Sequence, residues 1–382
     1  MTIFLARPER VGEGIPLAVK DLFDTAGLRT TYGSILFADH VPERTAEAVA
    51  RLEAAGYVNV GKTNLHEFAY GITSYNPHFG TVPNPLAPDR TAGGSSAGSA
   101  AALAAGLADA ALGSDSGASV RVPAACCGVV GFKPTHGLVP LEGCFPLAPS
   151  FDHAGPMGPD VGTCARMFEA LAPGFDRAEL GSLEEIEVGV AWLELAEPLV
   201  RARIEAAAEL FPRRRTVTFP FPEGVGAVFM REAAESHRGL FPEQAGAYGE
   251  NVRTKLERCL AVTDAEFEAG LRSLHEYRER ATEAIEGLDL LVTPTLAFVA
   301  PPAIKDDLEV RDAVIRFTYP FNALGWPALA LPCGPAEEGL PASVQLAAPT
   351  GEDARVIAAG ALLEQGVGDL ALRSRRAAAD RD

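Results

Sequence analysis

The chain has 382 residues, of which 47% are hydrophobic and 22% charged, a composition typical of a globular protein with a large buried core. Its formal net charge of −18 argues against nucleic acid or an anionic membrane surface as a direct partner. No segment approaches the roughly 20 apolar residues that a membrane-spanning helix needs, and the start MTIFLARPER lacks the long apolar stretch of a secretory signal.

The six cysteines are scattered, and no CxxC pair or Cys/His cluster has the spacing of a metal site. We therefore expect no metal and no cofactor. Free thiols, together with the missing secretory signal, favour a reducing, cytoplasmic location.

In chain order, the apolar run IPLAVK over residues 15–20 predicts a buried strand. Residues 45–55 carry apolar side chains at helical spacing and stop at Gly56, which predicts a helix. YVNVGKT (57–63) predicts a strand, and residues 76–93, rich in Pro, Asn and Gly, predict a long loop. An Ala-rich helix over 96–107 and a strand over 108–115 that runs into a Gly/Ser turn follow.

The second half contains five further predicted strands with helices between them: EIEVGVAW, RRTVTF, DLLVTPT, PALALPC and SVQLAAP. TDAE at Thr263 has the pattern of a capping box and predicts a helix to about Glu286. Strands that alternate with helices favour an α/β protein with a largely buried sheet. Residues 172–186 are a weak linker candidate, and the polar end, 373–382, is expected to fray.

Two Gly/Ser-rich segments follow each other closely, at residues 91–108 and 112–128. Glycine permits a tight backbone path in which several N–H groups point the same way, and such a nest can hold a developing oxyanion. One such stretch alone would fit a flexible loop or a close helix contact equally well. Two of them joined to apolar elements favour a functional site.

GSSAG, residues 94–98, matches the GxSxG nucleophile elbow of α/β-hydrolases. That elbow requires a strand directly before it, whereas PNPLAPDRTAG reads as a loop. The order of Asp and His that the elbow enzymes need is not evident either. We interpret this match as accidental.

GYVNVGKT, residues 56–63, fits the phosphate-binding pattern GxxxxGK[ST]. A P-loop follows a strand and precedes a helix, whereas here a predicted helix precedes Gly56 and the spacer residues read as the strand itself. A nucleotide-binding function is therefore disfavoured, and Lys62 is interpreted as a strand-end residue.

With these segments in view, the sequence resembles the amidase signature family over nearly the whole chain. The resemblance implies a single large α/β domain over residues 1–382, ordered to about residue 370, with a central mixed β-sheet sandwiched by helices. The matching segments are GIPLAVKDLFDTAGLRTTYGS (14–34), VGKTNLHEFAYG (60–71), GGSSAGSAAALAAG (93–106), GSDSGASVRVPAACCGVVGFKPTHG (113–137), APSFDHAGPM (148–157), PFNALGWPALALPCG and GLPASVQLAAP.

In that family a lysine, a serine after a cis peptide bond and a nucleophilic serine form the catalytic triad. The matching positions are Lys20, Ser95 and Ser119. The resemblance implies that Ser119 attacks the amide carbonyl and that Ser95 relays the proton between Ser119 and Lys20.

The chemistry of a lysine base agrees with this assignment. A serine hydroxyl is a weak nucleophile and needs a base, and lysine can serve once burial lowers its pKa. The chain has 5 Lys against 28 Arg, and an arginine could not deprotonate. Lys20 follows the apolar run IPLAV, so burial is expected. Without the resemblance, an ordinary lysine paired with Asp21 or Asp24 would be the favoured interpretation.

The resemblance also implies an oxyanion hole and a substrate pocket. The oxyanion hole is expected in the backbone N–H groups of Ser116, Gly117, Ala118 and Ser119. Ala118 departs from the usual glycine, and its methyl group would narrow the pocket or re-aim one donor. Lys20 also lies closer to the start of the sequence than in most members.

The expected substrate-binding residues are Gly71, Ile72, Thr73 and Arg121. The first three occupy a loop that lines the acyl pocket in relatives. Arg121 could bind a substrate carboxylate, or it could form a structural ion pair with Asp115. Asp152 is interpreted as a structural anchor.

The leading hypothesis is an amidohydrolase of linear C–N bonds that forms an acyl-enzyme on Ser119, with a small carboxylic amide, a carbamate or a urea derivative as substrate. One alternative is the glutaminase-type subunit of an aminoacyl-tRNA amidotransferase, which would need partner subunits. Another is a non-catalytic binding protein on the same fold. Besides the small-molecule amide, a second copy of the chain in a homodimer is an open partner.

Overall fold

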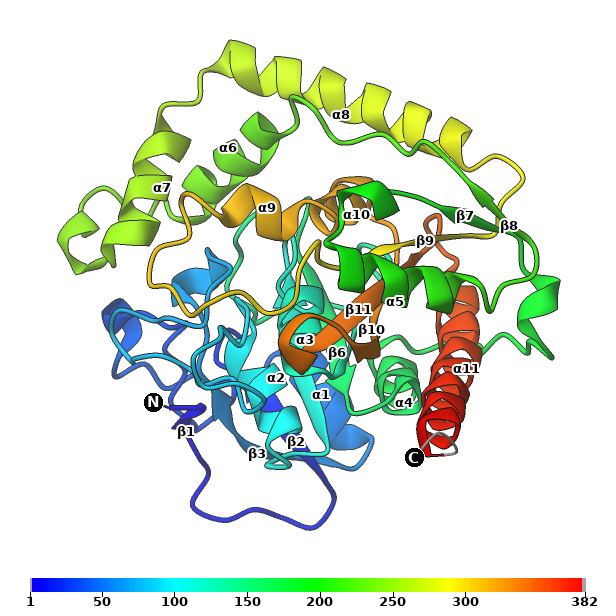
Figure 1. Ribbon diagram of the computed structural model, residues 1–382. Coiled ribbons are helices and arrows are strands. Elements are labelled where there is room, and N and C mark those ends of the chain that lie inside the picture. Colours follow the sequence, from blue (N-terminus) through cyan, green and yellow to red (C-terminus); the bar gives the residue numbers. More distant parts are fainter. Residues whose placement is uncertain (1, 380–382) are drawn as a thin grey trace.

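An eleven-stranded mixed sheet runs through the described part of the protein (Figure 1). The structure is a computed structural model and describes residues 2–379. The strands lie in the order β1-β3-β2-β4-β6-β5-β10-β11-β9-β7-β8. Their bounds are β1 (Phe4–Ala6), β2 (Ile15–Lys20), β3 (Tyr57–Thr63), β4 (Ala110–Asp115), β5 (Val130–Lys133), β6 (His153–Gly158), β7 (Val188–Val190), β8 (Arg214–Thr216), β9 (Leu290–Pro294), β10 (Ala328–Pro335) and β11 (Pro341–Ala347).

The sheet mixes parallel and antiparallel pairs. β2 is parallel to both β3 and β4, and β7 is parallel to both β8 and β9. The strands between them, from β4 through β6, β5, β10 and β11 to β9, pair antiparallel in succession. Every residue of β4, β6 and β9 is buried, as expected for strands that helices cover on both faces.

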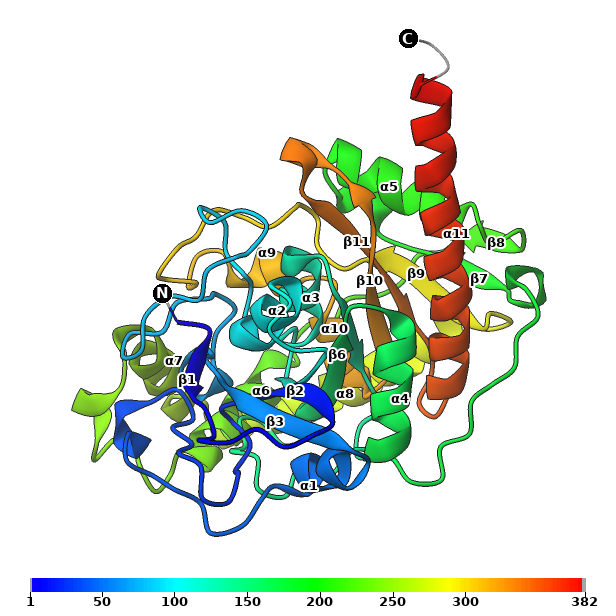
Figure 2. The same cartoon turned by 90° about the horizontal axis from the view of Figure 1, so that it is seen from below.

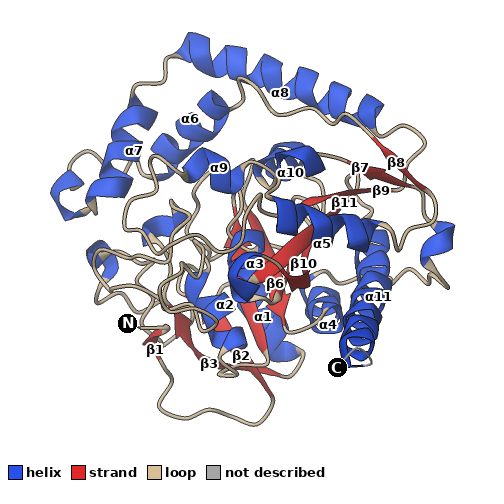
Figure 3. Ribbon diagram, viewed as in Figure 1, coloured by secondary structure: helices blue, strands red, loops and turns tan. Residues whose placement is uncertain are grey.

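Two helical layers cover the sheet (Figures 2 and 3). Helices α2 and α3 pack together on one face, and α1, α4 and α11 pack on the other. The helix bounds are α1 (Glu47–Ala54), α2 (Ala97–Ala104), α3 (Arg121–Cys127), α4 (Val161–Leu171), α5 (Pro198–Ala208), α6 (Gly226–Ser236), α7 (Glu250–Leu260), α8 (Asp264–Ala284), α9 (Arg311–Ile315), α10 (Tyr319–Leu324) and α11 (Asp353–Ala379).

Helices α6, α7 and α8 form an arch outside the sheet, at the top of Figure 1. α8 begins at the predicted cap, where the Thr263 hydroxyl accepts from the Glu266 amide and the Glu266 carboxylate accepts from the Thr263 amide. The arch faces α9 and α10 and leaves a cavity between them, described below.

The structure confirms the predicted α/β fold with a single mixed sheet between helices. The segment 172–186 does not divide the molecule, because β7 beyond it pairs with β9 in the same sheet. The sequence did not predict β1, β5 and β6. In β6, HAGPMG lacks an alternating pattern and contains Gly and Pro, and its backbone extends because β4 and β5 pair with it on either side.

The C-terminal end differs from the expectation. We expected order to about residue 370 and a frayed tail, but α11 continues to Ala379. Residues 380–382 of the predicted tail lie outside the described part. Among residues 2–379, no helix is long and apolar enough to cross a bilayer.

Candidate active site

Lys20 is the last residue of β2, and its side chain is fully buried. Its Nζ atom donates to Ser95 Oγ at 2.6 Å and to Ser114 Oγ at 2.8 Å, with the Ser114 carbonyl oxygen at 3.4 Å. Burial withdraws the amine from water and lowers the pKa of Lys20 to about 7. Interactions with Cys144, Asp115 and Asp152 oppose this lowering. An amine with a pKa near neutrality can accept and return a proton at physiological pH.

Ser95 joins the long loop to α2, and the Gly94–Ser95 peptide bond is cis. Its carbonyl oxygen accepts from the His66 amide at 3.2 Å. A Cβ atom at Gly94 would lie 2.4 Å from the Thr73 carbonyl oxygen, so the close approach of the two segments requires glycine. This packing fixes the Ser95 hydroxyl beside the Lys20 amine.

Ser119 lies in the turn between β4 and α3 and is 6% exposed. Its carbonyl oxygen accepts from the Ser96 amide at 3.2 Å, so the turn is bonded to the residue that follows Ser95. Within residues 2–379 the Ser119 hydroxyl has no hydrogen-bond partner, and it is not bonded to Ser95. Catalytic hydrogen bonds are often long in enzymes without substrate and tighten in the complex.

The turn that contains Ser119 presents free backbone amides. In this turn, four successive backbone amides donate no hydrogen bond to any other part of the described chain. They are those of Ser116, Gly117, Ala118 and Ser119. Unpaired N–H groups on a tight turn are what a developing oxyanion needs. The methyl group of Ala118, which a glycine would lack, is buried in an apolar cluster with Ile72 and Ile315.

Asp152 holds the same turn from the side of residues 147–148. Its carboxylate accepts from Ser116 Oγ at 2.5 Å and from the amides of Leu147 and Ala148 at 2.8 and 3.0 Å. Burial raises the pKa of Asp152, and these three hydrogen bonds oppose the rise. The expected anchoring role fits this arrangement.

The predicted pocket loop lies beside the triad segments. Its members are Gly71, Ile72 and Thr73. The Ile72 amide donates to Asp307 Oδ2 at 2.9 Å, and the other oxygen of Asp307 is paired with Lys255 Nζ at 2.6 Å. The Ile72 side chain shares the apolar cluster of Ala118. The loop is thus fixed next to the turn, and its contact with substrate stays a prediction.

Arg121 requires a correction, because its guanidinium group has no donor left for a substrate. The side chain is fully buried, and its five N–H groups all have acceptors. The acceptors are both Asp115 carboxylate oxygens, the Thr318 carbonyl, Gln345 Oε1 and Asn322 Oδ1. Although burial alone would raise it, the guanidinium holds the pKa of Asp115 below its usual value. Of the two interpretations of Arg121, the structure shows the ion pair.

We expect Arg121→Met to lower the free energy of unfolding by about 3–5 kcal/mol, because the Asp115 carboxylate would stay buried without its cation. Urea unfolding measures this. The matched control is Arg177→Met, which removes an exposed pair with Glu169 and should change stability by less than about 1 kcal/mol. Equal effects in the two variants would contradict the structural role.

The structure agrees with the interpretation that the matches of residues 56–63 to a P-loop and of residues 94–98 to a nucleophile elbow are accidental. Lys62 lies in β3 and is fully buried, with its Nζ 3.2 Å from Asp21 Oδ1 and bonded to Thr30 Oγ1 at 2.7 Å. It belongs to a strand and not to a phosphate-binding loop. Ser96 of GSSAG follows a loop and donates to the Ser114 carbonyl oxygen at 3.2 Å.

Comparison with known proteins decides the family. A family model described as Amidase matches residues 7–190 and 223–357. The chain belongs to the amidase signature family. It is accordingly a hydrolase that acts on the C–N bonds of amides.

Curated relatives of this amidase include a glutamyl-tRNA(Gln) amidotransferase subunit of Thermus thermophilus. The two are 37% identical, over 94% of this chain and 87% of the relative. The subunit of the same name from Natronomonas pharaonis is 35% identical, over 92% of this chain and 95% of the relative.

Solved structures give the same picture. A crystal structure described as an amidase is 38% identical with a TM-score of 0.84, over 92% of this chain and 84% of that one. A protein from a vestigial complex related to an s-triazine catabolic enzyme has 31% identity and a TM-score of 0.85, with the same coverage. The corresponding glutamyl-tRNA(Gln) amidotransferase subunit of Thermotoga maritima has 31% identity and a TM-score of 0.82, over 95% of this chain and 87% of that one.

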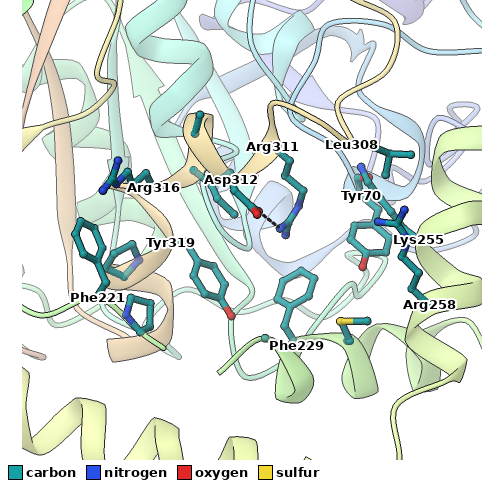
Figure 4. Close-up of a pocket in the computed structure, with 16 residues that line it drawn as sticks. Tyr70, Phe221, Phe229, Lys255, Arg258, Leu308, Arg311, Asp312, Arg316 and Tyr319 are labelled. Atoms are coloured by element: carbon teal, nitrogen blue, oxygen red, sulfur yellow. Dashed lines mark hydrogen bonds and ion pairs between the residues drawn. The ribbon is translucent and has the colours of Figure 1, made fainter. Parts of the chain in front are cut away.

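One cavity of the amidase has Ser116 of the turn in its wall, and a second lies near the turn through Tyr319. The first, of about 410 Å³, has Ser114, Ser116 and Asp152 in its wall together with apolar residues of the 141–149 segment. The other, of about 710 Å³, lies under the α6–α8 arch and is shown in Figure 4. Tyr319 in its wall reaches the turn, because a Cβ atom at Gly117 would lie 3.4 Å from the Tyr319 ring.

The sequence missed Ser114 and Tyr319 as members of the site. Ser114 could have been found, because β2 and β4 are parallel neighbours and their C-terminal ends meet at one edge of the sheet. Tyr319 carries no motif and reaches the turn only through the tertiary fold. No group of three or more His, Cys, Asp or Glu in the described part of the amidase could hold a metal ion.

Proposed function

We propose that this amidase hydrolyses a small carboxylic amide through an acyl-enzyme on Ser119, with Ser95 and Lys20 transferring the protons. The observation that carries the proposal is the buried Lys20 amine, which has a pKa of about 7 and a 2.6 Å hydrogen bond to the Ser95 hydroxyl. A serine nucleophile needs a base, and an amine of this pKa can serve as one, while the free amides of the turn supply the complementary oxyanion site.

In the acylation half of the reaction, the Ser119 oxygen bonds to the amide carbonyl carbon and its proton passes to Ser95. Ser95 in turn gives its own proton to the neutral Lys20 amine. The carbonyl oxygen becomes an oxyanion held by the turn amides. When the C–N bond breaks, Ser95 delivers a proton to the leaving nitrogen and is reprotonated by Lys20. Ammonia or an amine departs.

Deacylation repeats these steps with water. Water bonds to the ester carbonyl carbon while its proton passes through Ser95 to Lys20. The C–O bond to Ser119 then breaks, and the Ser119 oxygen recovers a proton by the same route. The carboxylic acid leaves, and Lys20 is neutral again.

The glutaminase-type subunit of an aminoacyl-tRNA amidotransferase is a second candidate. The curated relatives named above favour it. In that case the amide would be that of glutamine, and partner subunits would use the ammonia. Because the chain carries a net charge of −18, the partners would have to supply the contacts to tRNA.

A panel of aliphatic, aromatic and carbamate substrates, with glutamine added, separates the candidates by release of ammonia or amine. We expect the chain alone to hydrolyse at least one small amide. Ammonia from glutamine only when amidotransferase partner subunits are present would favour the second candidate. No turnover and no labelling by a fluorophosphonate would indicate a binding protein on the same fold. Light scattering on the same sample distinguishes a monomer from a homodimer.

A further inference from the structure

The cavity of about 410 Å³ beside the candidate triad, called here the 141–149 cavity, has a mainly apolar wall. Its ionisable side chains, apart from the Cys144 thiol, are those of Glu142, which is exposed, and Asp152, which is bonded to Ser116 and to two backbone amides. None of the described wall residues is Lys, Arg or His. Such a wall favours an uncharged apolar ligand and disfavours an anion. The apolar members of the wall are Leu22, Leu141, Phe145, Pro146, Leu147 and Pro149.

The wall of this cavity reaches the proton-transfer residues. Ser114 lines it, and the Ser114 hydroxyl accepts from Lys20 Nζ at 2.8 Å. The same Nζ atom donates to Ser95 Oγ at 2.6 Å, so two hydrogen bonds connect the wall to the Ser95 hydroxyl. Ser116, the first residue of the turn of free amides, also lines the cavity. The cavity is therefore next to both the proton relay and the oxyanion turn.

Backbone hydrogen bonds fix the cavity wall against the segment that follows β2. The Phe145 amide donates to the Leu22 carbonyl oxygen at 3.1 Å, and the Asp24 amide donates to the Gly143 carbonyl oxygen at 2.8 Å. The Phe145 ring packs on that of Phe68, with 4.8 Å between the ring centres. The wall is thus part of the folded framework. A ligand that enters a pre-formed cavity pays little free energy for ordering it.

The direction of proton transfer indicates which part of a substrate would occupy this cavity. In the proposed mechanism Ser95 delivers a proton to the leaving nitrogen, which must therefore lie within hydrogen-bond reach of the Ser95 hydroxyl. A substituent on that nitrogen is then on the side of Lys20 and Ser114, where the cavity lies. The size also suits a ring, because an apolar cavity of about 150 Å³ is enough to hold benzene.

We propose that the substrate is an N-substituted amide whose leaving amine carries an uncharged apolar group, about as large as a benzyl group, and that this group binds in the 141–149 cavity. Leu141 and Phe145 are then specificity-determining residues for the leaving amine. The proposal rests on the acyl-enzyme function proposed above and specifies its leaving group. A glutaminase-type subunit releases ammonia from a primary amide and would have no group to place there.

Four amides that share one acyl group test the proposal: the primary, N-methyl, N-benzyl and N-(4-carboxybenzyl) amides, with the acyl group of the best substrate in the panel above. We expect kcat/KM for the N-benzyl amide to exceed that for the N-methyl amide at least about tenfold, because a ring buries more apolar area than a methyl group. The 4-carboxybenzyl amide should lose most of this gain, because Glu142 and Asp152 disfavour an anion. Equal or higher values for the primary and N-methyl amides would overturn the proposal.

A substitution in the wall tests where the group binds. Leu141→Trp fills part of the cavity and should reduce the preference for the N-benzyl over the N-methyl amide about 10- to 100-fold, whereas Leu141→Met should keep it. Leu199→Trp is the matched control, because Leu199 is a half-exposed leucine of α5 outside the cavity wall. It should leave the preference unchanged.

A binding measurement does not depend on turnover. In Ser119→Ala, calorimetry should show the N-benzyl amide binding at least about tenfold more tightly than the N-methyl amide, and adding Leu141→Trp should remove this difference. Equal affinities, or a difference that Leu141→Trp leaves intact, would overturn the assignment of the cavity while fluorophosphonate labelling of the wild type keeps the catalytic function. Absence of both turnover and labelling in the wild type would instead overturn the acyl-enzyme function.

Discussion

Ser119→Ala should reduce amide hydrolysis roughly 10⁴- to 10⁶-fold and abolish labelling by a fluorophosphonate, the range seen when the nucleophile of a serine hydrolase is removed. The reason is that, in the described residues, Ser119 carries the one unpaired hydroxyl on the turn of free amides. Ser114 is bonded to Lys20, and Ser116 is bonded to Asp152. Without the Ser119 oxygen no acyl-enzyme can form, and only substrate binding and oxyanion stabilisation still contribute to the rate.

The matched control for this substitution is Ser96→Ala, which removes the serine of the accidental GSSAG motif. Its hydroxyl donates to the Ser114 carbonyl oxygen, so we expect a modest loss of stability but retained labelling. Ser119→Ala itself should leave the unfolding midpoint nearly unchanged, because its hydroxyl has no partner in the described residues. Labelling that persists in Ser119→Ala and disappears in Ser96→Ala would move the nucleophile to the other serine.

Local patterns in the sequence predicted the elements that carry the triad. The apolar run before Lys20 forms β2, YVNVGKT forms β3, and the segment before the Gly/Ser turn forms β4. These strands have strong patterns of their own. β5 and β6 do not, and they become strands only because neighbouring strands pair with them. Pairing across distant segments is a tertiary effect that a local pattern does not contain.

The candidate site likewise has a part that local motifs predicted and a part that depends on the tertiary fold. The motifs located the segments of Lys20, Ser95 and the oxyanion turn, but the partners of these groups come from elsewhere in the chain. Arg121 illustrates the limit, since its position allowed either a substrate contact or an ion pair. Its partners Asn322 and Gln345 lie 201 and 224 residues away in sequence, and only the fold shows that they occupy the guanidinium.

The sequence motifs did not predict the cavity under the arch. The arch of α6–α8 consists of amphipathic helices without a catalytic motif, and the cavity forms because α9 and α10 lie opposite α6 and α7. The excess of cations in its wall is visible only when residues 255, 258 and 311 are seen around one space. A net charge of −18 gave no hint of a positively charged pocket.

Lys20→Met and Lys20→Arg should each lower kcat/KM by several orders of magnitude, because neither side chain can accept a proton from Ser95. Arginine keeps the positive charge, so its failure would show that deprotonation of the amine, and not its charge, is what the reaction needs. The wild-type rate should depend on pH in a defined direction. Since the neutral amine is the base and its pKa is about 7, kcat/KM should fall about tenfold per pH unit below pH 7 and level off above it.

Stability separates a catalytic role for Lys20 from a structural one. The folded pKa, about 7, lies below the ordinary value of 10.5, so the folded state binds fewer protons than the unfolded state between these values. Stability should therefore rise with pH from about 7 to 10.5 in the wild type, and this rise should be reduced in Lys20→Met. At pH 7 the Lys20→Met variant buries no amine and so lacks the desolvation penalty of the wild type. We therefore expect its unfolding midpoint to be no lower than that of the wild type, although the variant is inactive. An inactive variant with a much lower unfolding midpoint than the wild type would make Lys20 a structural residue. An active one with an unchanged pH profile would exclude it as the base.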